Sequence, residues 1–405
     1  MAILPVLRRC FLPVVMLALA GCVDDSERRT VALPADGPDY WPTETWQTAT
    51  PESKGFSAGA FDTLAADAAT ALPYHTSLLV IRDGYIVHES YHTPEGESTT
   101  VTADTKHHVW SVTKSVTSLV LGTAWTRGDL LPGDLDTATG DSFPDVIADL
   151  DADDTRRDIT LRDALEMRSG LYWNDAWVIS VASPMLFPDP DCPGNDDVTL
   201  CSVLHRDQTW APGTVWNYST FDSYLIGAFF LELTDSSLRD YAAANLFAPM
   251  NIGYVSGDWT NWPTGSDYTF GGGLLQLTAR DMAKIGFLML QDGRWEDEQL
   301  LAPEWFELST APQGTGLIAT FDGSGAPVGS TAFDIPYGFQ WWRVTGPDLG
   351  GLPSLSARGL GGQLIHVFPE QDLIVVVTCD AALADDETTT ELQSFIAAEI
   401  LAALP

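Results

Sequence analysis

The chain has 405 residues, a hydrophobic content of 45% and 14 tryptophans, so it can bury a large core as one composite domain or two. Its formal net charge of −36 excludes nucleic acid as a favourable partner, because phosphate backbones attract basic surfaces. The acidic residues are scattered along the chain, which is more typical of a solvated acidic surface than of a site that steers cationic substrates.

The N-terminal segment has the features of an export signal. Arg8 and Arg9 precede an apolar run over 11–20 that is short for a membrane span. The sequence Leu-Ala-Gly-Cys over 19–22 resembles the lipobox of bacterial lipoproteins, with Cys22 as the acylated first residue of the mature protein. This resemblance implies a signal peptide over 1–21 and a tether over 22–50, with an uncleaved anchor or a simple secretory signal as the alternative. Val rather than Asp at position 23 favours a cell-envelope location at the outer membrane, facing the periplasm or the exterior.

The folded part begins with a helix and a hairpin. Apolar residues at helical spacing predict a helix over 55–71. Two β-rich runs over 76–82 and 85–91 flank Asp83-Gly84, which predicts an antiparallel hairpin. A second helix is expected to open at Ser111 and continue through the apolar stretch 116–124.

The middle of the chain, over 131–265, is rich in Asp, Pro, Gly and Trp, with short helical patterns over 161–167 and 224–233. We expect an inserted, mostly helical subdomain here. Cys192 and Cys201 bracket a polar loop, and in an oxidising compartment we expect them to form a disulfide worth about 2.7 kcal/mol in the chain-entropy model. Cys379 lies in an apolar run and is expected to be a buried thiol.

Regular structure returns after residue 266. Thr278 is a predicted N-cap for a helix over 279–290, followed by strands over 337–344, 363–368 and 373–379 and a terminal helix over 388–403. The element order predicts an α+β fold: an antiparallel sheet flanked by helices, built from residues 51–130 and 266–405 and interrupted by the helical subdomain.

Ser111 and Lys114 carry the chemistry of this chain. Residues at i and i+3 face the same way on a helix, so a desolvated, neutral Lys114 could take the proton of Ser111 and make it a nucleophile for acyl transfer. The alternative is that this short Ser-x-x-Lys pattern arises by chance. No serine lies in a Gly-x-Ser-x-Gly elbow, which excludes the α/β-hydrolase arrangement. The histidines show no metal-ligand spacing with an acidic partner, so we expect neither metal nor cofactor.

Other segments of the chain resemble a known family that contains a Ser-x-x-Lys pair. The chain resembles the serine β-lactamase and penicillin-binding-protein superfamily over most of residues 51–400, and within it the class C-like branch of carboxylesterases, D-aminopeptidases and 6-aminohexanoate-dimer hydrolases. This resemblance implies a β-lactamase-like sandwich. The segments that carry it are Trp-Ser-Val-Thr-Lys-Ser over 110–115 and the stretches 159–171, 212–220, 271–282 and 337–342.

The resemblance implies roles for individual residues. Ser111 would be the nucleophile, Lys114 its base, and Tyr218 the proton shuttle that serves the leaving group and the deacylating water. The backbone amides of Ser111 and Gln363 would form the oxyanion hole. The family's strand-edge motif matches Leu360-Gly361-Gly362, whose glycines would let backbone approach the ligand; a simple glycine-rich turn is the alternative.

Two departures from the family pattern bear on the substrate. Leu360 replaces the cationic or His residue that helps to bind a β-lactam or peptide carboxylate, and Thr220 replaces an Asn. Both variations resemble the esterase and 6-aminohexanoate-dimer hydrolase side of the family. Aromatic side chains around the helical subdomain could line an acyl pocket or belong to the core, and Asp175 is a weaker candidate for holding a substrate amine; the residues are Tyr172, Trp173, Asp175, Trp177 and Trp216.

The sequence thus predicts a lipid-anchored, metal-independent serine hydrolase that cleaves small-molecule esters or amides through an acyl-enzyme on Ser111. A cell-wall D,D-peptidase or β-lactamase keeps the chemistry and changes the substrate. A non-catalytic envelope lipoprotein that uses the fold as a binding module is the third alternative.

Overall fold

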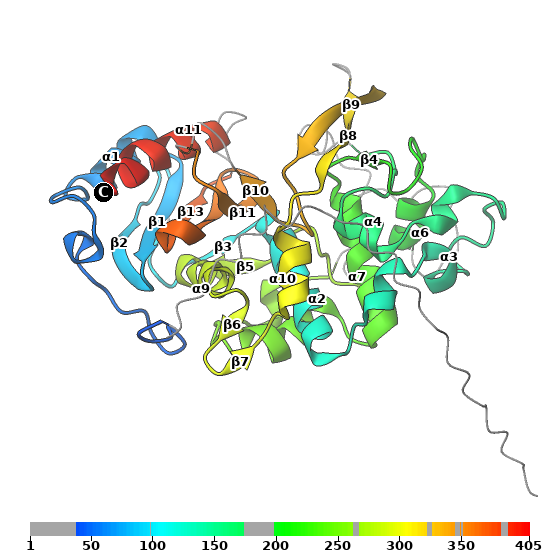
Figure 1. The fold of residues 1–405 in the computed structure, drawn as a ribbon, viewed down its shortest axis with the longest axis horizontal. Coiled ribbons are helices and arrows are strands. Elements are labelled where there is room, and N and C mark those ends of the chain that lie inside the picture. The colour runs from blue at the N-terminus through cyan, green and yellow to red at the C-terminus, as the bar shows by residue number, and fades with distance from the viewer. Residues whose placement is uncertain are drawn as a thin grey trace, which may run out of the picture. The chain divides into compact units, whose positions relative to one another are not determined.

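A six-stranded antiparallel sheet forms the centre of the protein, in the order β10-β11-β12-β13-β1-β2. A computed structural model describes residues 38–97, 99–173, 198–261, 267–321, 326–344, 349, 351–381 and 388–405. Strands from both ends of the chain therefore meet in one sheet (Figure 1). The strands are β1 His75–Arg82, β2 Tyr85–Tyr91, β10 Trp342–Val344, β11 Ser354–Gly359, β12 Gln363–Phe368 and β13 Leu373–Cys379.

The predicted hairpin and the last two predicted strands are confirmed. Asp83 and Gly84 have φ of 47° and 77°, the left-handed pair that a tight turn between right-twisted strands requires. β12 and β13 are buried at every position, since both faces of the sheet are covered by helices. Their near-continuous apolar sequence follows from this burial.

Alternating residues of β1 divide between two cores. Leu79 and Ile81 pack with α2 Val112–Arg127 and α9 Ala279–Leu290 on one face. Leu78 and Val80 pack on the other face, which α1 Leu64–Ala71 and α11 Thr388–Phe395 cover (Figure 1). The period of two along a strand thus gives an α+β sandwich with helices on both faces of the sheet.

The region expected to be a helical insert contains mostly helices. Its core is continuous with that of the sheet: side chains of α7 and α2 belong to the same buried group as those of β12 and β13. The helical part and the sheet part therefore share one hydrophobic interior. The helices are α3 Thr139–Ser142, α4 Leu161–Leu165, α6 Val198–Leu204, α7 Thr220–Thr234 and α8 Leu238–Ala242.

Smaller elements complete the fold. β8 Gly314–Phe321 and β9 Pro327–Ile335 form a hairpin that extends away from the sheet in Figure 1 and pairs with β4 Val215–Trp216. Thr278 caps α9 by accepting a hydrogen bond from the Asp281 amide, as predicted. The others are β3 Lys106–His108, β5 Gln276–Thr278, β6 Arg294–Trp295, β7 Glu298–Gln299 and α10 Pro303–Thr310.

Three predicted boundaries were wrong. The helix expected from residue 55 begins at Leu64, because Gly55 and Gly59 adopt left-handed φ of 86° and 71° and break the preceding turns. The strand expected from residue 337 begins at Trp342, because Gln340 adopts φ of 64°. The terminal helix is α-helical only to Phe395 and continues as π and 3₁₀ turns to residue 403.

Candidate active site

Ser111 lies at the N-terminus of α2, directly after a constrained residue. Trp110 has φ of 49°, a left-handed conformation that costs a bulky side chain about 1–3 kcal/mol. The surrounding backbone holds it there: the Val109 amide donates to Leu275 O at 2.9 Å, and the Thr113 amide donates to Trp110 O at 3.0 Å. Strain of this kind gathers at functional sites, and here it fixes the position of the Ser111 hydroxyl.

The Lys114 side chain is buried at this site, with 1% of its surface exposed. Its Nζ lies 2.9 Å from Ser111 Oγ, which confirms that the i, i+3 spacing brings the two groups together. It also donates to Thr220 Oγ1 and to Gly272 O, both at 3.1 Å. These three partners are uncharged, and they belong to α2, α7 and the glycine-rich segment 271–273.

The glycines of that segment are required by close packing. A Cβ on Gly271 would lie 2.5 Å from Ser223 O in α7, a distance that real Cβ atoms do not reach. The Gly271 carbonyl meanwhile accepts a hydrogen bond from Thr117 Oγ1 of α2 at 2.9 Å. Gly271 therefore lets the backbone pass between two helices, and Gly272 O can reach the Lys114 amine.

Tyr218 lies beside Lys114 in an aromatic cluster. The Lys114 Nζ is 5.0 Å from the centroid of the Tyr218 ring, and this ring stacks on Trp342 with centroids 5.6 Å apart. Trp216 and Tyr337 enclose the ring further, with centroids 6.4 and 6.1 Å away. The structure thus brings Ser111, Lys114 and Tyr218 together.

Gln340 is a residue that the sequence analysis missed. Its carbonyl accepts from Ser115 Oγ at 2.7 Å, its Oε1 accepts from Ser223 Oγ at 2.8 Å, and its Nε2 donates to Leu165 O at 2.9 Å. Behind the site, Gln340 therefore binds α2 through its backbone carbonyl and α7 and α4 through its buried side chain. Its one local signal is its place in the Tyr-Gly-Phe-Gln-Trp-Trp segment over 337–342.

The end of β11 lies against the nucleophile. A Cβ on Gly359 would lie 3.2 Å from Ser111 N and 2.3 Å from Val109 O, so only glycine fits between this strand and the start of α2. Gln363, the predicted second oxyanion-hole residue, is the cross-strand partner of Gly359. The Gln363 side chain donates to Cys379 O at 2.7 Å, on the neighbouring strand β13. Gly359 is therefore the residue of this strand end that packs against Ser111 N, and the oxyanion role of the Gln363 amide stays a prediction.

The predicted substrate-binding residues fall into different environments. Thr220 contacts Lys114, whereas Leu360 and the positive-φ residues Gly361 and Gly362 form the turn between β11 and β12. Trp173 is buried with its ring centroid 3.9 Å from that of Phe221, so it belongs to the core. The Tyr172 amide donates to Asp207 O at 2.8 Å. Asp175 and Trp177 lie outside the described residues.

Arg358 supplies a cation that the sequence analysis did not assign to the site. Its guanidinium carbon lies 5.5 Å from the centroid of the Trp342 ring, and its charge interacts favourably with Tyr218. Burial lowers the pKa of Arg358 to about 10. The cation missing at Leu360 is thus present two residues earlier, on the strand itself.

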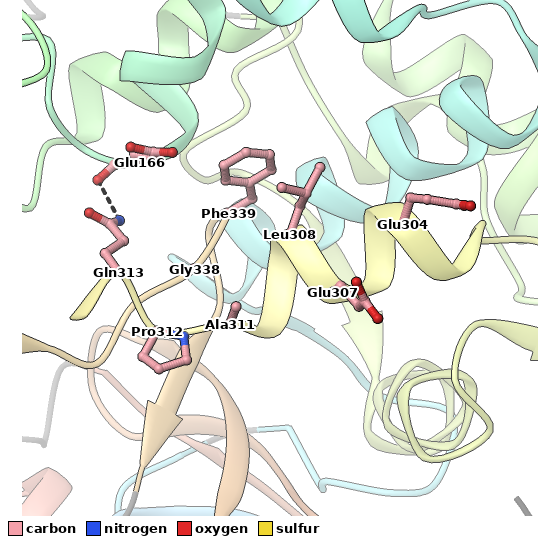
Figure 2. A pocket seen from close by; sticks show the side chains of 9 residues that line it. All are labelled: Glu166, Glu304, Glu307, Leu308, Ala311, Pro312, Gln313, Gly338 and Phe339. Carbon is pink, nitrogen blue, oxygen red and sulfur yellow. Dashed lines mark hydrogen bonds between the residues drawn. The ribbon is translucent and has the colours of Figure 1, made fainter. Parts of the chain in front are cut away.

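A separate pocket of about 500 Å³ opens beside α10 and contains none of these residues (Figure 2). Gln313 Nε2 donates to the backbone carbonyl of Glu166 at one end, and Glu304 and Glu307 project from α10 at the other. Burial raises the pKa of the Glu166 carboxyl. Within the described ranges, no three His, Cys, Asp or Glu side chains are arranged to hold a metal ion.

Two cysteines can be placed. Cys201 is disulfide-bonded, and its predicted partner Cys192 lies outside the described residues, so that pairing stays a prediction. Cys379 is a free, buried thiol on β13, as predicted, and burial raises its pKa far above the ordinary value. This thiol is therefore not a nucleophile.

Comparison with known families agrees with the geometry of the site. The model of the beta-lactamase family matches residues 75–398, which include the sheet, the Ser111–Lys114 pair and Tyr218. The chain belongs to the beta-lactamase family. A search of curated proteins finds no match.

Solved structures of several hydrolases share the fold of this beta-lactamase-family protein. A protein assigned as a 6-aminohexanoate-dimer hydrolase from Bacillus anthracis has a TM-score of 0.62 and 17% identity, over 89% of this chain and 88% of its own. A penicillin-binding-protein homologue from Caulobacter crescentus has a TM-score of 0.60 and 15% identity, with coverages of 85% and 99%. EstCE1, a hydrolase with promiscuous acyltransferase activity, has a TM-score of 0.59 and 15% identity, with coverages of 84% and 98%.

Asp222 is a buried carboxyl group near the N-terminus of α7. Its side chain accepts hydrogen bonds from Ser169 Oγ at 2.7 Å and Ser169 N at 3.2 Å. Its own amide donates to Ser219, the N-cap of α7, which directly follows Tyr218. Desolvation outweighs these hydrogen bonds and raises the pKa of Asp222 to about 7.

The raised pKa makes stability depend on pH. The folded state holds the Asp222 proton up to about pH 7, whereas the unfolded chain releases it near pH 4, so this contribution to stability is present below pH 4 and lost as pH rises through 7. We expect Asp222→Asn to gain stability relative to the wild type between pH 5 and pH 8, measured by urea unfolding. The exposed Asp145→Asn is the control. If the difference in unfolding free energy between Asp222→Asn and the wild type is the same at pH 5 and pH 8, the raised pKa of Asp222 is wrong.

Proposed function

We propose that this protein is a serine hydrolase that cleaves esters or small linear amides through an acyl-enzyme on Ser111. The observation that carries the proposal is the 2.9 Å contact between the buried Lys114 Nζ and Ser111 Oγ. Burial disfavours the charged form of an amine, and the neutral form is the one that accepts a proton. A binding module would gain nothing from this buried pair, which argues against a non-catalytic role.

The hydrogen bonds of Lys114 suit it to act as a base. A neutral amine has two N–H groups and one lone pair. When its N–H groups are donated to Gly272 O and Thr220 Oγ1, the lone pair can accept the proton of Ser111, whose Oγ lies 2.9 Å away. Ser111 Oγ then attacks the carbonyl carbon of the substrate and forms a tetrahedral intermediate.

The remaining steps need oxyanion stabilisation and proton transfer. We assign one donor of the oxyanion hole to the Ser111 amide and the second to the end of β11, where Gly359 packs against Ser111 N and pairs with Gln363. Tyr218 would protonate the leaving group and then activate the deacylating water, because its phenol lies beside the Lys114 amine and within the field of Arg358. Collapse of the intermediate releases the alcohol or amine, and water releases the acid.

A D,D-peptidase or β-lactamase activity is the second candidate. Arg358 is the observation that favours it, because a guanidinium pairs well with a substrate carboxylate. Leu360 at the turn after the strand favours uncharged esters and amides instead. Parallel assays with short p-nitrophenyl esters, a linear amide dimer, a muropeptide and a chromogenic cephalosporin separate the two.

Ser111→Ala is expected to abolish hydrolysis of p-nitrophenyl acetate and butyrate and covalent labelling by a fluorophosphonate probe, because it removes the nucleophile. The matched control is Ser142→Ala, in a short helix far along the chain from α2. Product absorbance and intact mass are the measurements. Undiminished hydrolysis by the variant would refute the assignment of Ser111.

Tyr218→Phe is expected to lower kcat for the same esters by roughly 100-fold or more, because it removes the proton shuttle and keeps the ring that stacks on Trp342. Fluorophosphonate labelling should fall less than turnover, since the nucleophile and Lys114 remain. Tyr337→Phe, in the same aromatic cluster, is the control. An unchanged kcat would move the shuttle to another residue.

We also propose that the protein is anchored by lipid on Cys22, on the strength of the Leu-Ala-Gly-Cys sequence. None of the helices in the described part of the chain has the length and apolarity needed to cross a bilayer. More than one acyl chain gives stable attachment. Cys22→Ser is expected to eliminate palmitate incorporation and to release the protein from the membrane fraction, whereas Cys10→Ser should change neither. Palmitate labelling that survives in the Cys22 variant would contradict the proposal.

A further inference from the structure

Two large apolar side chains are exposed beside the nucleophile. Trp110 is 40% exposed and directly precedes Ser111, and Leu360 is 38% exposed and directly follows Gly359, the residue packed against Ser111 N. The two side chains thus flank the contact between β11 and the start of α2.

Both side chains are held on rigid backbone. Leu360 sits in a tight turn closed by a hydrogen bond of 3.2 Å from Gly362 N to Gly359 O. The turn is clamped from behind, because a Cβ on Gly361 would lie 2.5 Å from Ala381 and one on Gly362 would lie 2.8 Å from Leu392. Trp110 is locked by its left-handed φ of 49°.

Neither position needs an apolar side chain for folding. The first central position of a turn accepts most residues, and a left-handed position favours Gly, Asn or Asp over Trp. What sets these two side chains apart from the other exposed apolar residues is that one lies next to Ser111 and the other next to Gly359, which packs against Ser111 N.

We propose that Trp110 and Leu360 form an apolar rim that binds the acyl chain of the substrate and selects alkyl acyl groups of about four to eight carbons. This inference rests on the proposed acyl-enzyme at Ser111. In the acyl-enzyme, the alkyl chain would extend from Ser111 Oγ and pass between the side chains of Trp110 and Leu360. It would cover their exposed surface and so remove that surface from water. Each methylene buried in this way should raise kcat/KM by up to about fourfold.

The test compares p-nitrophenyl acetate, butyrate, hexanoate and octanoate. We expect kcat/KM of the wild type to rise with chain length. Leu360→Asn should lower the ratio of kcat/KM for hexanoate to kcat/KM for acetate at least fivefold, and Trp110→Asn should lower this ratio as well. Leu360→Met, which keeps an apolar side chain, should retain the wild-type ratio. Leu131→Asn and Val255→Asn, at exposed apolar positions outside the site, should leave the ratio unchanged.

A series of alkylboronic acids, which bind a serine nucleophile reversibly, gives a second readout that does not need turnover. Hexylboronic acid should bind the wild type more tightly than methylboronic acid, and Leu360→Asn should narrow this difference. If the hexanoate-to-acetate ratio of kcat/KM is the same in the wild type and in Leu360→Asn while hydrolysis still depends on Ser111, the proposed rim is wrong and the proposed function stands. Absence of both hydrolysis and boronate binding would overturn the proposed function and the rim together.

Discussion

Burial of the Lys114 amine is the constraint on which the rest of the site depends. An amine with 1% exposure needs a hydrogen-bond partner in every direction, because water cannot supply one. The partners come from three separate segments: Ser111 on α2, Thr220 on α7 and the carbonyl of Gly272. Satisfying one nitrogen therefore fixes two helices and a loop relative to each other, and it sets the position of the nucleophile at the same time.

Several local irregularities of the backbone lie around this nitrogen. Gly271 and Gly359 occupy places where a Cβ would lie 2.5 and 2.3 Å from a backbone carbonyl oxygen, and Trp110 is held in a left-handed conformation. Gln340, also left-handed at φ of 64°, joins the helices behind the site. These exceptions to local rules let the start of α2, the end of β11 and the segment 271–273 approach one another closely enough to form the site.

The sequence predicted those features that depend on local patterns. The hairpin at Asp83-Gly84, the capped helix α9 and the pair Ser111–Lys114 all follow from spacings of a few residues. The contact between Lys114 and Thr220 spans 106 positions and that between Ser115 and Gln340 spans 225, so no local signal announces either. Gly359 and Gln363 pair across the turn between β11 and β12, and the folded chain is needed to see that Gly359 packs against Ser111 N. Arg358 lies outside the family motif at 360–362, so that motif does not mark it.

The three residues 358–360 explain how this fold can separate catalysis from substrate choice. Strand alternation sends Arg358 and Gly359 to opposite faces of β11, so the cation lies by Trp342 while the glycine packs against Ser111. Leu360 follows in the turn and faces solvent. Lys114 donates hydrogen bonds to Ser111, α7 and Gly272, and none of these three acceptors lies on β11. The strand end that we propose selects the substrate and the residue that holds the nucleophile therefore belong to different elements, β11 and α2.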